Sequence, residues 1–305
     1  MTIRRSVVVL GSTASGKSDA AMTAALLQPR GSVQIIAADA MQVYKRMDIG
    51  TAKPTVADQA AIPHHCVDVA EPSERYNVAR YVDDVAVARK VIGEAGAAEL
   101  VVGGTGLYVT AIVDGLDMPG EFPEIRAQLE ANDNTEELFA QLFALDPQAT
   151  TKMDPNNRRR IIRALEVCFG TGTTFSSFGQ GIGSFAPTDT VLIGLRWNRD
   201  ALRARIAYRV DLMIERGLVD EVRGLLAEPE GMSVTARQAL GYKEVIEHLE
   251  GRWSLAEAVA ATVLRTQQFA IRQERWFRRD PRIQWVDVQE DPIEEVTPAI
   301  VAALE

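Results

Sequence analysis

A glycine-rich segment near the start of the chain has the residue types needed to bind a phosphate. It fits the pattern G-x-x-x-x-G-K-[ST] over the eight residues Gly11, Ser12, Thr13, Ala14, Ser15, Gly16, Lys17 and Ser18. Such loops point successive backbone N–H groups at phosphate oxygens, and the lysine adds a positive charge. Ser18 can ligate Mg²⁺, which usually also takes substrate phosphates and water. The pattern recognises the anion, so a nucleotide and any other diphosphate remain equally open.

Two other segments place chemical groups where predicted strands end. Asp39 follows the apolar run 33–38, and a carboxylate there can accept a proton from an incoming nucleophile. The run 100–102 leads into Gly-Gly-Thr105, at a place where many ATPases and GTPases have an aspartate that holds Mg²⁺. This difference weakens a hydrolase interpretation. Two structural alternatives stay open, since Asp39 could cap a turn or helix and 103–106 could be a simple strand-to-helix turn.

The hydrophobic pattern predicts the elements that position these groups. Apolar runs bounded by turns predict strands over 6–10, 33–38, 100–102, 191–197 and 283–288. Helical patterns lie between them, over 18–27, 78–94, 199–226, 234–249 and 255–277. Strands that alternate with helices predict an α/β fold of the P-loop type, with a parallel sheet covered by helices on both faces. The phosphate loop and Asp39 would then share one edge of the sheet.

The alternation stops between residues 122 and 187. The pattern there predicts helices over 122–131, 135–145 and 158–169, followed by a Gly/Ser/Thr/Phe loop over 170–185. We therefore predict a helical insertion domain over 122–187. Residues 1–121 and 188–305 would form the catalytic core, with a helical part at the C-terminal end.

Composition and charge limit the functional classes. The chain has 305 residues, of which 47% are hydrophobic, and no apolar run approaches the ~20 residues of a membrane span. Cys66 and Cys168 lie far apart without metal-ligand spacing, which indicates buried free thiols and a cytoplasmic protein. A net charge of −9 argues against indiscriminate coating of nucleic acid. Segments 152–163 and 265–282 are locally basic, and they predict either a bounded polyanion site or solvated helix faces.

Several segments, taken in order, resemble one family, the bacterial tRNA dimethylallyltransferases. They are Gly11–Ser18, Asp39-Ala-Met-Gln-Val-Tyr44, Met47-Asp-Ile-Gly-Thr-Ala-Lys-Pro54, Pro63-His-His65, Gly103-Gly-Thr105 with Leu107-Tyr108, Arg163-Ala-Leu-Glu166 and Ala239-Leu-Gly-Tyr242. The resemblance implies transfer of a dimethylallyl group from dimethylallyl diphosphate to the exocyclic amine of the adenosine immediately 3′ of the anticodon in tRNA, with Mg²⁺. It further implies that Asp39 is the general base and that Thr105 orients the leaving group. We expect a monomer with no obligate protein partner.

The resemblance also assigns binding residues. The diphosphate would be held by Gly11–Ser18 and by Arg237. The tRNA anticodon stem-loop would be contacted by Asp39, Ala40, Met41, Gln42, Thr105, Arg126, Arg159, Arg160, Ile161, Ile162 and Arg163. Gln267 and Thr173 replace residues that are commonly basic in the family, which affects RNA contacts rather than the chemistry. A small-molecule phosphotransferase and a nucleotide-dependent RNA-binding switch remain as alternatives.

Overall fold

The computed structural model describes residues 5–151, 153–178 and 183–305. These residues form two compact units, each considered by itself below. The larger unit comprises the described residues of Met1–Val113 together with Pro187–Glu305. The smaller unit comprises those of Asp114–Ala186.

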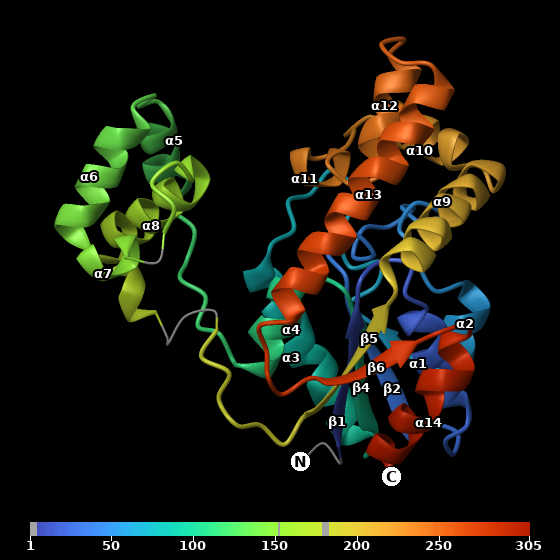
Figure 1. The fold of residues 1–305 in the computed structure, drawn as a ribbon. Helices are drawn as coiled ribbons and strands as arrows, with labels where there is room; N and C mark the ends of the chain where they lie inside the picture. Colours follow the sequence, from blue (N-terminus) through green and yellow to red (C-terminus); the bar gives the residue numbers. More distant parts are fainter. Residues whose placement is uncertain (1–4, 152, 179–182) are drawn as a thin grey trace. The chain divides into compact units, whose positions relative to one another are not determined.

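The larger unit is built on a six-stranded parallel sheet (Figure 1). Its strands are β1 (Ser6–Gly11), β2 (Val33–Ala38), β3 (His64–His65), β4 (Ala98–Gly103), β5 (Val191–Trp197) and β6 (Gln284–Val288), in the order β3-β2-β4-β1-β5-β6. β1 lies between β4 and β5, so the loop that follows it emerges in the middle of the sheet edge. The predicted α/β fold is confirmed. β3 was not predicted, because two residues are too short to show a period of two.

Helices cover both faces of the sheet, as predicted. Val7 and Val9 of β1 face a core shared with α1 (Lys17–Leu26) and α14 (Pro292–Leu304). The alternate residues of the same strand face a second core, which includes side chains of α3 (Val78–Glu94) and α4 (Gly106–Val113). Both faces of each central strand are thus buried, which is typical of parallel sheets.

The helices between β5 and β6 are more broken than predicted. They are α9 (Arg199–Glu215), α10 (Leu218–Ala227), α11 (Val234–Arg237), α12 (Tyr242–Leu249) and α13 (Leu255–Phe277). Elsewhere in the larger unit, a short helix α2 (Val56–Ala61) follows β2. A single helix over 199–226 is wrong, because Gly217 between α9 and α10 has a φ of +98°. A single helix over 234–249 is also wrong, because Gly241 has a φ of +87°. α13 has the predicted bounds.

The smaller unit is helical, and within its described residues it contains no strand. It consists of α5 (Pro123–Glu130), α6 (Thr135–Leu145), α7 (Pro147–Thr150), α8 (Arg158–Thr171) and a 3-10 turn at Phe175–Ser177 (Figure 1). The three predicted helices are present with slightly different ends. Their apolar faces form a separate core around Leu138, Leu142 and Leu165.

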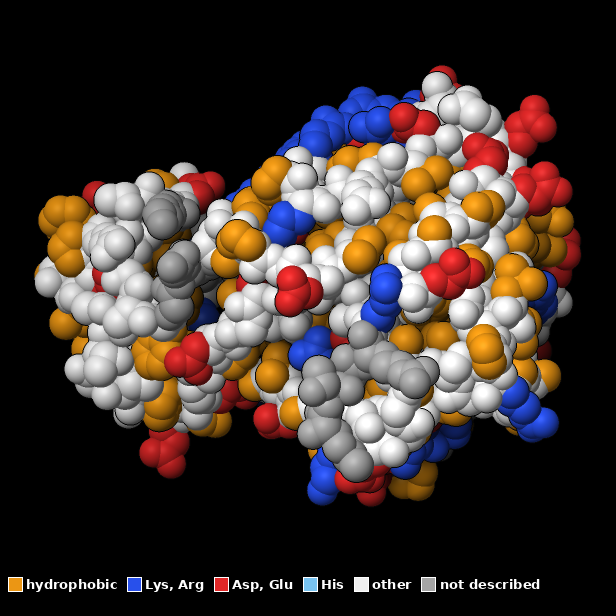
Figure 2. Space-filling model, turned by 90° about the horizontal axis from the view of Figure 1, so that it is seen from below, with side chains coloured by type: hydrophobic (Ala, Val, Ile, Leu, Met, Phe, Trp, Pro, Cys, Tyr) orange, Lys and Arg blue, Asp and Glu red, His pale blue; other side chains and the backbone are white. Residues whose placement is uncertain are grey.

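Surface and composition features agree with the sequence. Both cysteines are free and buried, and burial raises the pKa of the Cys66 thiol to about 12. No helix in the described part of the chain is long and apolar enough to cross a lipid bilayer. Figure 2 looks at the amino ends of the strands, where apolar, acidic and basic side chains are interspersed and a band of Lys and Arg follows one edge.

Candidate active site

The phosphate loop joins the end of β1 to the start of α1. Gly16 has a φ of +84°, a left-handed conformation that favours glycine, and α1 begins at the next residue. A Cβ at Gly16 would lie 2.3 Å from Cγ of Pro292, so packing also requires glycine here. The first N–H groups of α1 have no helical partner, and an anion in the loop could accept hydrogen bonds from them.

Side chains from the end of β5 and from α9 support this loop. Nε of Arg205 donates to the carbonyl of Ala14 at 3.0 Å, and Nε1 of Trp197 donates to the carbonyl of Ser15 at 2.9 Å. The Arg205 guanidinium lies 4.4 Å from the centre of the Trp197 ring. Arg209, one turn further along α9, lines the cavities described below.

Arg205 and Arg209 of α9 were not predicted from the sequence as site residues. One available signal was their i, i+4 spacing on a helix that follows a strand. Because β5 pairs with β1 in parallel, α9 begins at the same sheet edge as the phosphate loop. The spacing alone does not say which side of a helix faces the site.

Two cations share the interior of the loop. The pKa of Lys17 is lowered to about 8, chiefly by burial and then by the nearby Arg209, while Asp39 and Asp19 act in the opposite direction. Burial likewise lowers the pKa of Arg209. Nζ of Lys17 donates to the carbonyl of Ser12 at 3.3 Å. A bound anion would stabilise the charged forms of both side chains.

Asp39 and Thr105 lie side by side, because β2 and β4 are neighbours in the sheet. Oδ1 of Asp39 accepts from the N–H groups of Met41 at 2.8 Å and Gln42 at 3.3 Å. Oγ1 of Thr105 accepts from the N–H of Ala40 at 3.0 Å, and the N–H of Thr105 donates to the Ala38 carbonyl at 3.1 Å. These bonds fix the carboxylate and the hydroxyl relative to each other.

Glycine permits the close approach of these two strand ends. A Cβ at Gly103 would lie 2.1 Å from the carbonyl oxygen of Ala38, a backbone atom that cannot move aside. The Gly-Gly-Thr turn is therefore more than a flexible link, because any side chain at its first position would push β2 and β4 apart.

Gln273 of α13 connects the phosphate loop to the Gly-Gly-Thr turn. Its Oε1 accepts from the N–H of Thr13 at 2.9 Å, and its Nε2 donates to the carbonyl of Gly104 at 2.8 Å. The side chain is buried, and both amide ends are used. The distance between the diphosphate loop and Thr105 is thus set partly by a helix more than 160 residues away in the chain.

Two cavities of different character meet at this site. The smaller measures about 370 Å³ and is largely apolar, with walls that include Met41, Val210 and Leu240. The larger measures about 730 Å³ and is the more polar of the two, and Lys17 and Ser18 line it. The residues lining both are Thr13, Ala14, Asp39, Thr51, Arg209, Met213 and Phe269. This arrangement can place a diphosphate on one side of Asp39 and an apolar or aromatic group on the other.

The predicted contact residues 40–42 also lie at these cavities. Ala40 and Met41 line the smaller cavity together with Thr105, whereas Gln42 lines the larger. Arg237 lines neither. Its guanidinium pairs with Glu250 at 3.2 Å, and it is Arg205 and Arg209 that stand at the phosphate loop instead.

The other predicted tRNA-contacting residues belong to the smaller unit, and they divide by exposure. The side chains of Ile161 and Ile162 are buried in its core, so no ligand reaches them in this conformation. Arg159 and Arg160 are exposed, and neither forms an ion pair with any described residue. Arg159 and Arg160 are thus free to contact a polyanion.

Arg126 and Arg163 are committed to a buried carboxylate. Glu166 is fully buried, accepts from Nη2 of Arg126 at 2.7 Å and from the N–H of Phe122 at 2.8 Å, and forms an ion pair with Nη1 of Arg163 at 3.1 Å. Burial acts to raise the pKa of Glu166, but the N–H of Phe122 and the two guanidinium groups outweigh it and hold that pKa below its usual value. The Arg-Ala-Leu-Glu segment therefore helps to hold this unit together through the pairing of its arginine and glutamate.

The fold and the site together define a P-loop-type α/β protein with a phosphate site beside an apolar cavity. The family model for IPP transferase matches residues 42–280. The chain is 46% identical to the tRNA dimethylallyltransferase of Thermobifida fusca, over 92% of this chain and 89% of that protein. It belongs to the tRNA dimethylallyltransferase family and is a transferase, which decides against the phosphotransferase and RNA-switch alternatives.

Solved structures agree with this assignment. The full-length tRNA isopentenylpyrophosphate transferase from Bacillus halodurans is 36% identical, with a TM-score of 0.68 over 98% of this chain and 96% of that one. A eukaryotic dimethylallyltransferase acting on tRNA is 25% identical, with a TM-score of 0.83 over 98% of this chain and 78% of that one.

Proposed function

We propose that this chain transfers the dimethylallyl group of dimethylallyl diphosphate to the exocyclic amine of the adenosine 3′ of the tRNA anticodon, with Asp39 as general base. One observation carries the proposal. Asp39 stands on the wall common to the polar cavity, which contains the phosphate loop, and the apolar cavity, which can admit a base. A carboxylate at this junction can reach a nucleophile that attacks the carbon attached to a bound diphosphate.

The phosphate loop would act on the leaving group. The bond between the allylic carbon and the diphosphate oxygen breaks with its electron pair going to oxygen, so negative charge builds on the diphosphate. Loop N–H groups, Lys17 and Arg209 surround that position with fixed donors and positive charge, and such preorganised donors usually supply the largest catalytic effect. The diphosphate is therefore released rather than transferred.

Ser18 is the residue that would hold Mg²⁺. Its hydroxyl lines the polar cavity and forms no hydrogen bond with any described residue. No group of three or more His, Cys, Asp or Glu in the described part of the chain could hold a metal ion by itself. A hydroxyl and an open polar cavity suit an ion that takes most of its ligands from substrate phosphates and water. When bound, Mg²⁺ would neutralise part of the diphosphate charge.

Asp39 would accept the proton that the adenosine amine loses in the reaction. The exocyclic nitrogen forms a bond to the allylic carbon and loses one proton, which the Asp39 carboxylate accepts. Thr105 accepts a hydrogen bond from Ala40, so the hydrogen of its own hydroxyl is left for the ligand. We assign that hydrogen to the leaving oxygen, which agrees with an orienting role rather than a nucleophilic one.

Exposed arginines on α13 would contact the RNA backbone. Gln268, Arg272 and Arg275 are exposed and spaced so that they lie along one side of the helix, and Arg279 is exposed in the turn that follows it. None of the three arginines forms an ion pair with a described residue, and Arg272 lines the apolar cavity. Contacts of this kind to phosphates position a nucleic acid, while the target base leaves its stack to enter the enzyme. Arg159 and Arg160 would add contacts from the smaller unit.

Single-turnover kinetics of Asp39→Asn test the role of the carboxylate. The protein is incubated with Mg²⁺, unmodified tRNA and dimethylallyl diphosphate, and the nucleosides are analysed over time. We expect the rate to fall by about 10²- to 10⁴-fold, the usual contribution of a general base, while diphosphate binding persists. Asp83→Asn, at an exposed position on α3, serves as the charge-matched control. A rate for Asp39→Asn equal to that of the control would remove Asp39 from the mechanism.

A further inference from the structure

Lys53 is a buried cation beside the phosphate loop that the proposed chemistry does not use. It belongs to the Met47–Pro54 segment, and it lines the polar cavity together with Lys17. Its side chain is only 3% exposed. A lysine in this place could be a ligand of the diphosphate, or it could hold the surrounding chain in position. The two roles require different hydrogen-bonding partners.

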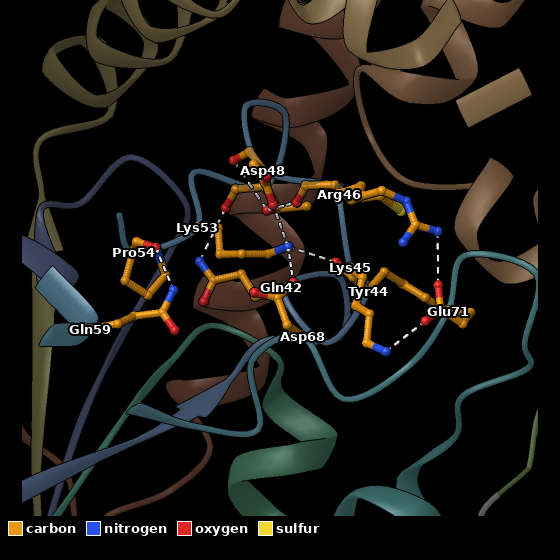
Figure 3. A network of polar contacts seen from close by, with 12 residues as sticks. Gln42, Tyr44, Lys45, Arg46, Asp48, Lys53, Pro54, Gln59, Asp68 and Glu71 are labelled. Carbon is orange, nitrogen blue, oxygen red and sulfur yellow. Dashed lines mark hydrogen bonds and ion pairs between the residues drawn. The ribbon is translucent and has the colours of Figure 1, made fainter. Parts of the chain in front are cut away.

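The ammonium group of Lys53 is fully occupied by the protein itself (Figure 3). Nζ donates to the Tyr44 carbonyl at 2.7 Å, to Oδ1 of Asp48 at 2.5 Å and to Oδ1 of Asp68 at 2.6 Å. An ammonium has three N–H donors, and these three acceptors use them all. Two carboxylates against one ammonium also leave the cluster negatively charged, which opposes a diphosphate rather than attracting it.

From this cluster, hydrogen bonds lead to the general base. The backbone N–H of Lys53 donates to the Asp48 carbonyl at 3.0 Å, which closes the turn between them. Nε2 of Gln42 donates to the carbonyls of Thr51 and Ala52, at 3.1 Å each, inside that turn. The backbone N–H of Gln42 in turn donates to Oδ1 of Asp39 at 3.3 Å. The turn that Lys53 closes thereby holds one of the donors that orient Asp39.

The same turn is fixed from its other side by α10. The Glu221 carboxylate accepts from the backbone N–H groups of Asp48 at 3.0 Å and Ile49 at 2.8 Å, and from the Tyr242 hydroxyl at 2.5 Å. A Cβ at Gly50 would lie 2.3 Å from the Tyr242 ring, so the turn packs directly on that side chain. With one side anchored on α10, Lys53 is what holds the side that faces Asp68 and the polar cavity.

We propose that Lys53 is a positioning residue for the transferase reaction, which holds the 39–54 segment so that Asp39 points into the site, and that it does not bind the diphosphate. The geometry that carries this is the buried ammonium with three protein acceptors, connected through Gln42 to Asp39. The inference rests on the proposed role of Asp39 as the base.

Two measurements on Lys53→Met separate positioning from binding. Calorimetry with inorganic diphosphate and Mg²⁺ reports the anion site, and single-turnover transfer reports the chemistry. We expect the dissociation constant to stay within about twofold, while the transfer rate falls roughly 10- to 100-fold, the scale of a misplacement near 1 Å. Lys45→Met is the matched control, because Lys45 lies in the same segment but pairs with Glu71 at a side chain that is 45% exposed. Its rate should equal that of the native protein.

Two results for Lys53→Met would overturn the proposal. A diphosphate dissociation constant raised as much by Lys53→Met as by Lys17→Met, with an unchanged transfer rate, would make Lys53 a ligand and overturn the proposal. A transfer rate equal to that of Lys45→Met would overturn it as well. If Lys53→Met does not fold, Asp68→Asn removes one acceptor of the ammonium and should lower the rate without weakening diphosphate binding. Asp39→Asn distinguishes the two failures, because a native rate for that variant refutes the base and leaves the diphosphate result for Lys53 intact.

Discussion

The depressed pKa of Lys17 couples diphosphate binding to pH. In the empty site Lys17 titrates at about 8, against an ordinary value of 10.5, because it is buried beside Arg209. A bound diphosphate places negative charge against the ammonium, which raises its pKa toward or above the ordinary value. Between pH 8 and 10 the empty protein therefore holds fewer protons than the complex. Binding takes up a proton in this range, and affinity falls as pH rises.

The magnitude follows from the two pKa values. With a pKa of about 8, Lys17 is about nine-tenths protonated at pH 7 and about one-tenth protonated at pH 9. If the complex keeps the proton throughout, the dissociation constant rises about 10-fold between pH 7 and 9, which corresponds to about 1.4 kcal/mol. Proton uptake on binding should be about half a proton per site at pH 8.

Calorimetry in buffers with different ionisation enthalpies measures both quantities. Inorganic diphosphate with Mg²⁺ is titrated into the native protein and into Lys17→Met at several pH values. The variant retains the ionisation of the ligand itself, so the difference between the two proteins isolates the lysine. A native protein whose pH dependence and proton uptake match those of Lys17→Met would refute the reasoning, since Lys17 would then remain charged in the empty site.

Two further predictions concern α13 and the turn that follows it. Gln273→Glu keeps an acceptor for the phosphate loop but loses the donor to Gly104 and adds a buried negative charge, so kcat/KM should fall at least about 10-fold; Gln284→Glu, at the exposed first residue of β6, should change it much less, and equal losses would contradict the reasoning. Arg279→Ala should weaken tRNA binding and reduce the salt dependence of that binding by about one phosphate contact, with the KM for dimethylallyl diphosphate unchanged; fluorescence titrations at several salt concentrations measure this, and an unaltered salt slope would place the RNA elsewhere.

The sequence was sufficient for the parts of the site that follow strand ends. Strands placed by apolar runs, together with parallel pairing, bring the ends of β1, β2 and β4 to one edge of the sheet. Asp39, Thr105 and the phosphate loop therefore meet for topological reasons that a single sequence can reveal. At these positions the residue types and the order of the strands along the chain point to the same site.

The groups supplied by long-range packing could not be predicted in this way. Nothing in the pattern of α13 distinguishes the buried Gln273 from its exposed neighbour Gln268, because the burial of a polar residue depends on which backbone atoms reach it. The same holds for Arg209, whose position needs the packing of α9 against α13. The pairing of Arg126 and Arg163 could not be predicted either, since the buried Glu166 that engages them gave no signal of its own.

The packing of α14 on the phosphate loop has a consequence for synthesis of the protein. Pro292 lies directly against Gly16, and the apolar side of α14 shares a core with α1, so residues nearly 280 positions apart complete one support. The ribosome synthesises the phosphate loop early and α14 late, and domains generally fold as units. A nascent or shortened chain that stops before α14 would contain the whole phosphate-loop motif but would lack the α14 side chains that pack against it. The packing of α14 on the loop can therefore form only after α14 has left the ribosome.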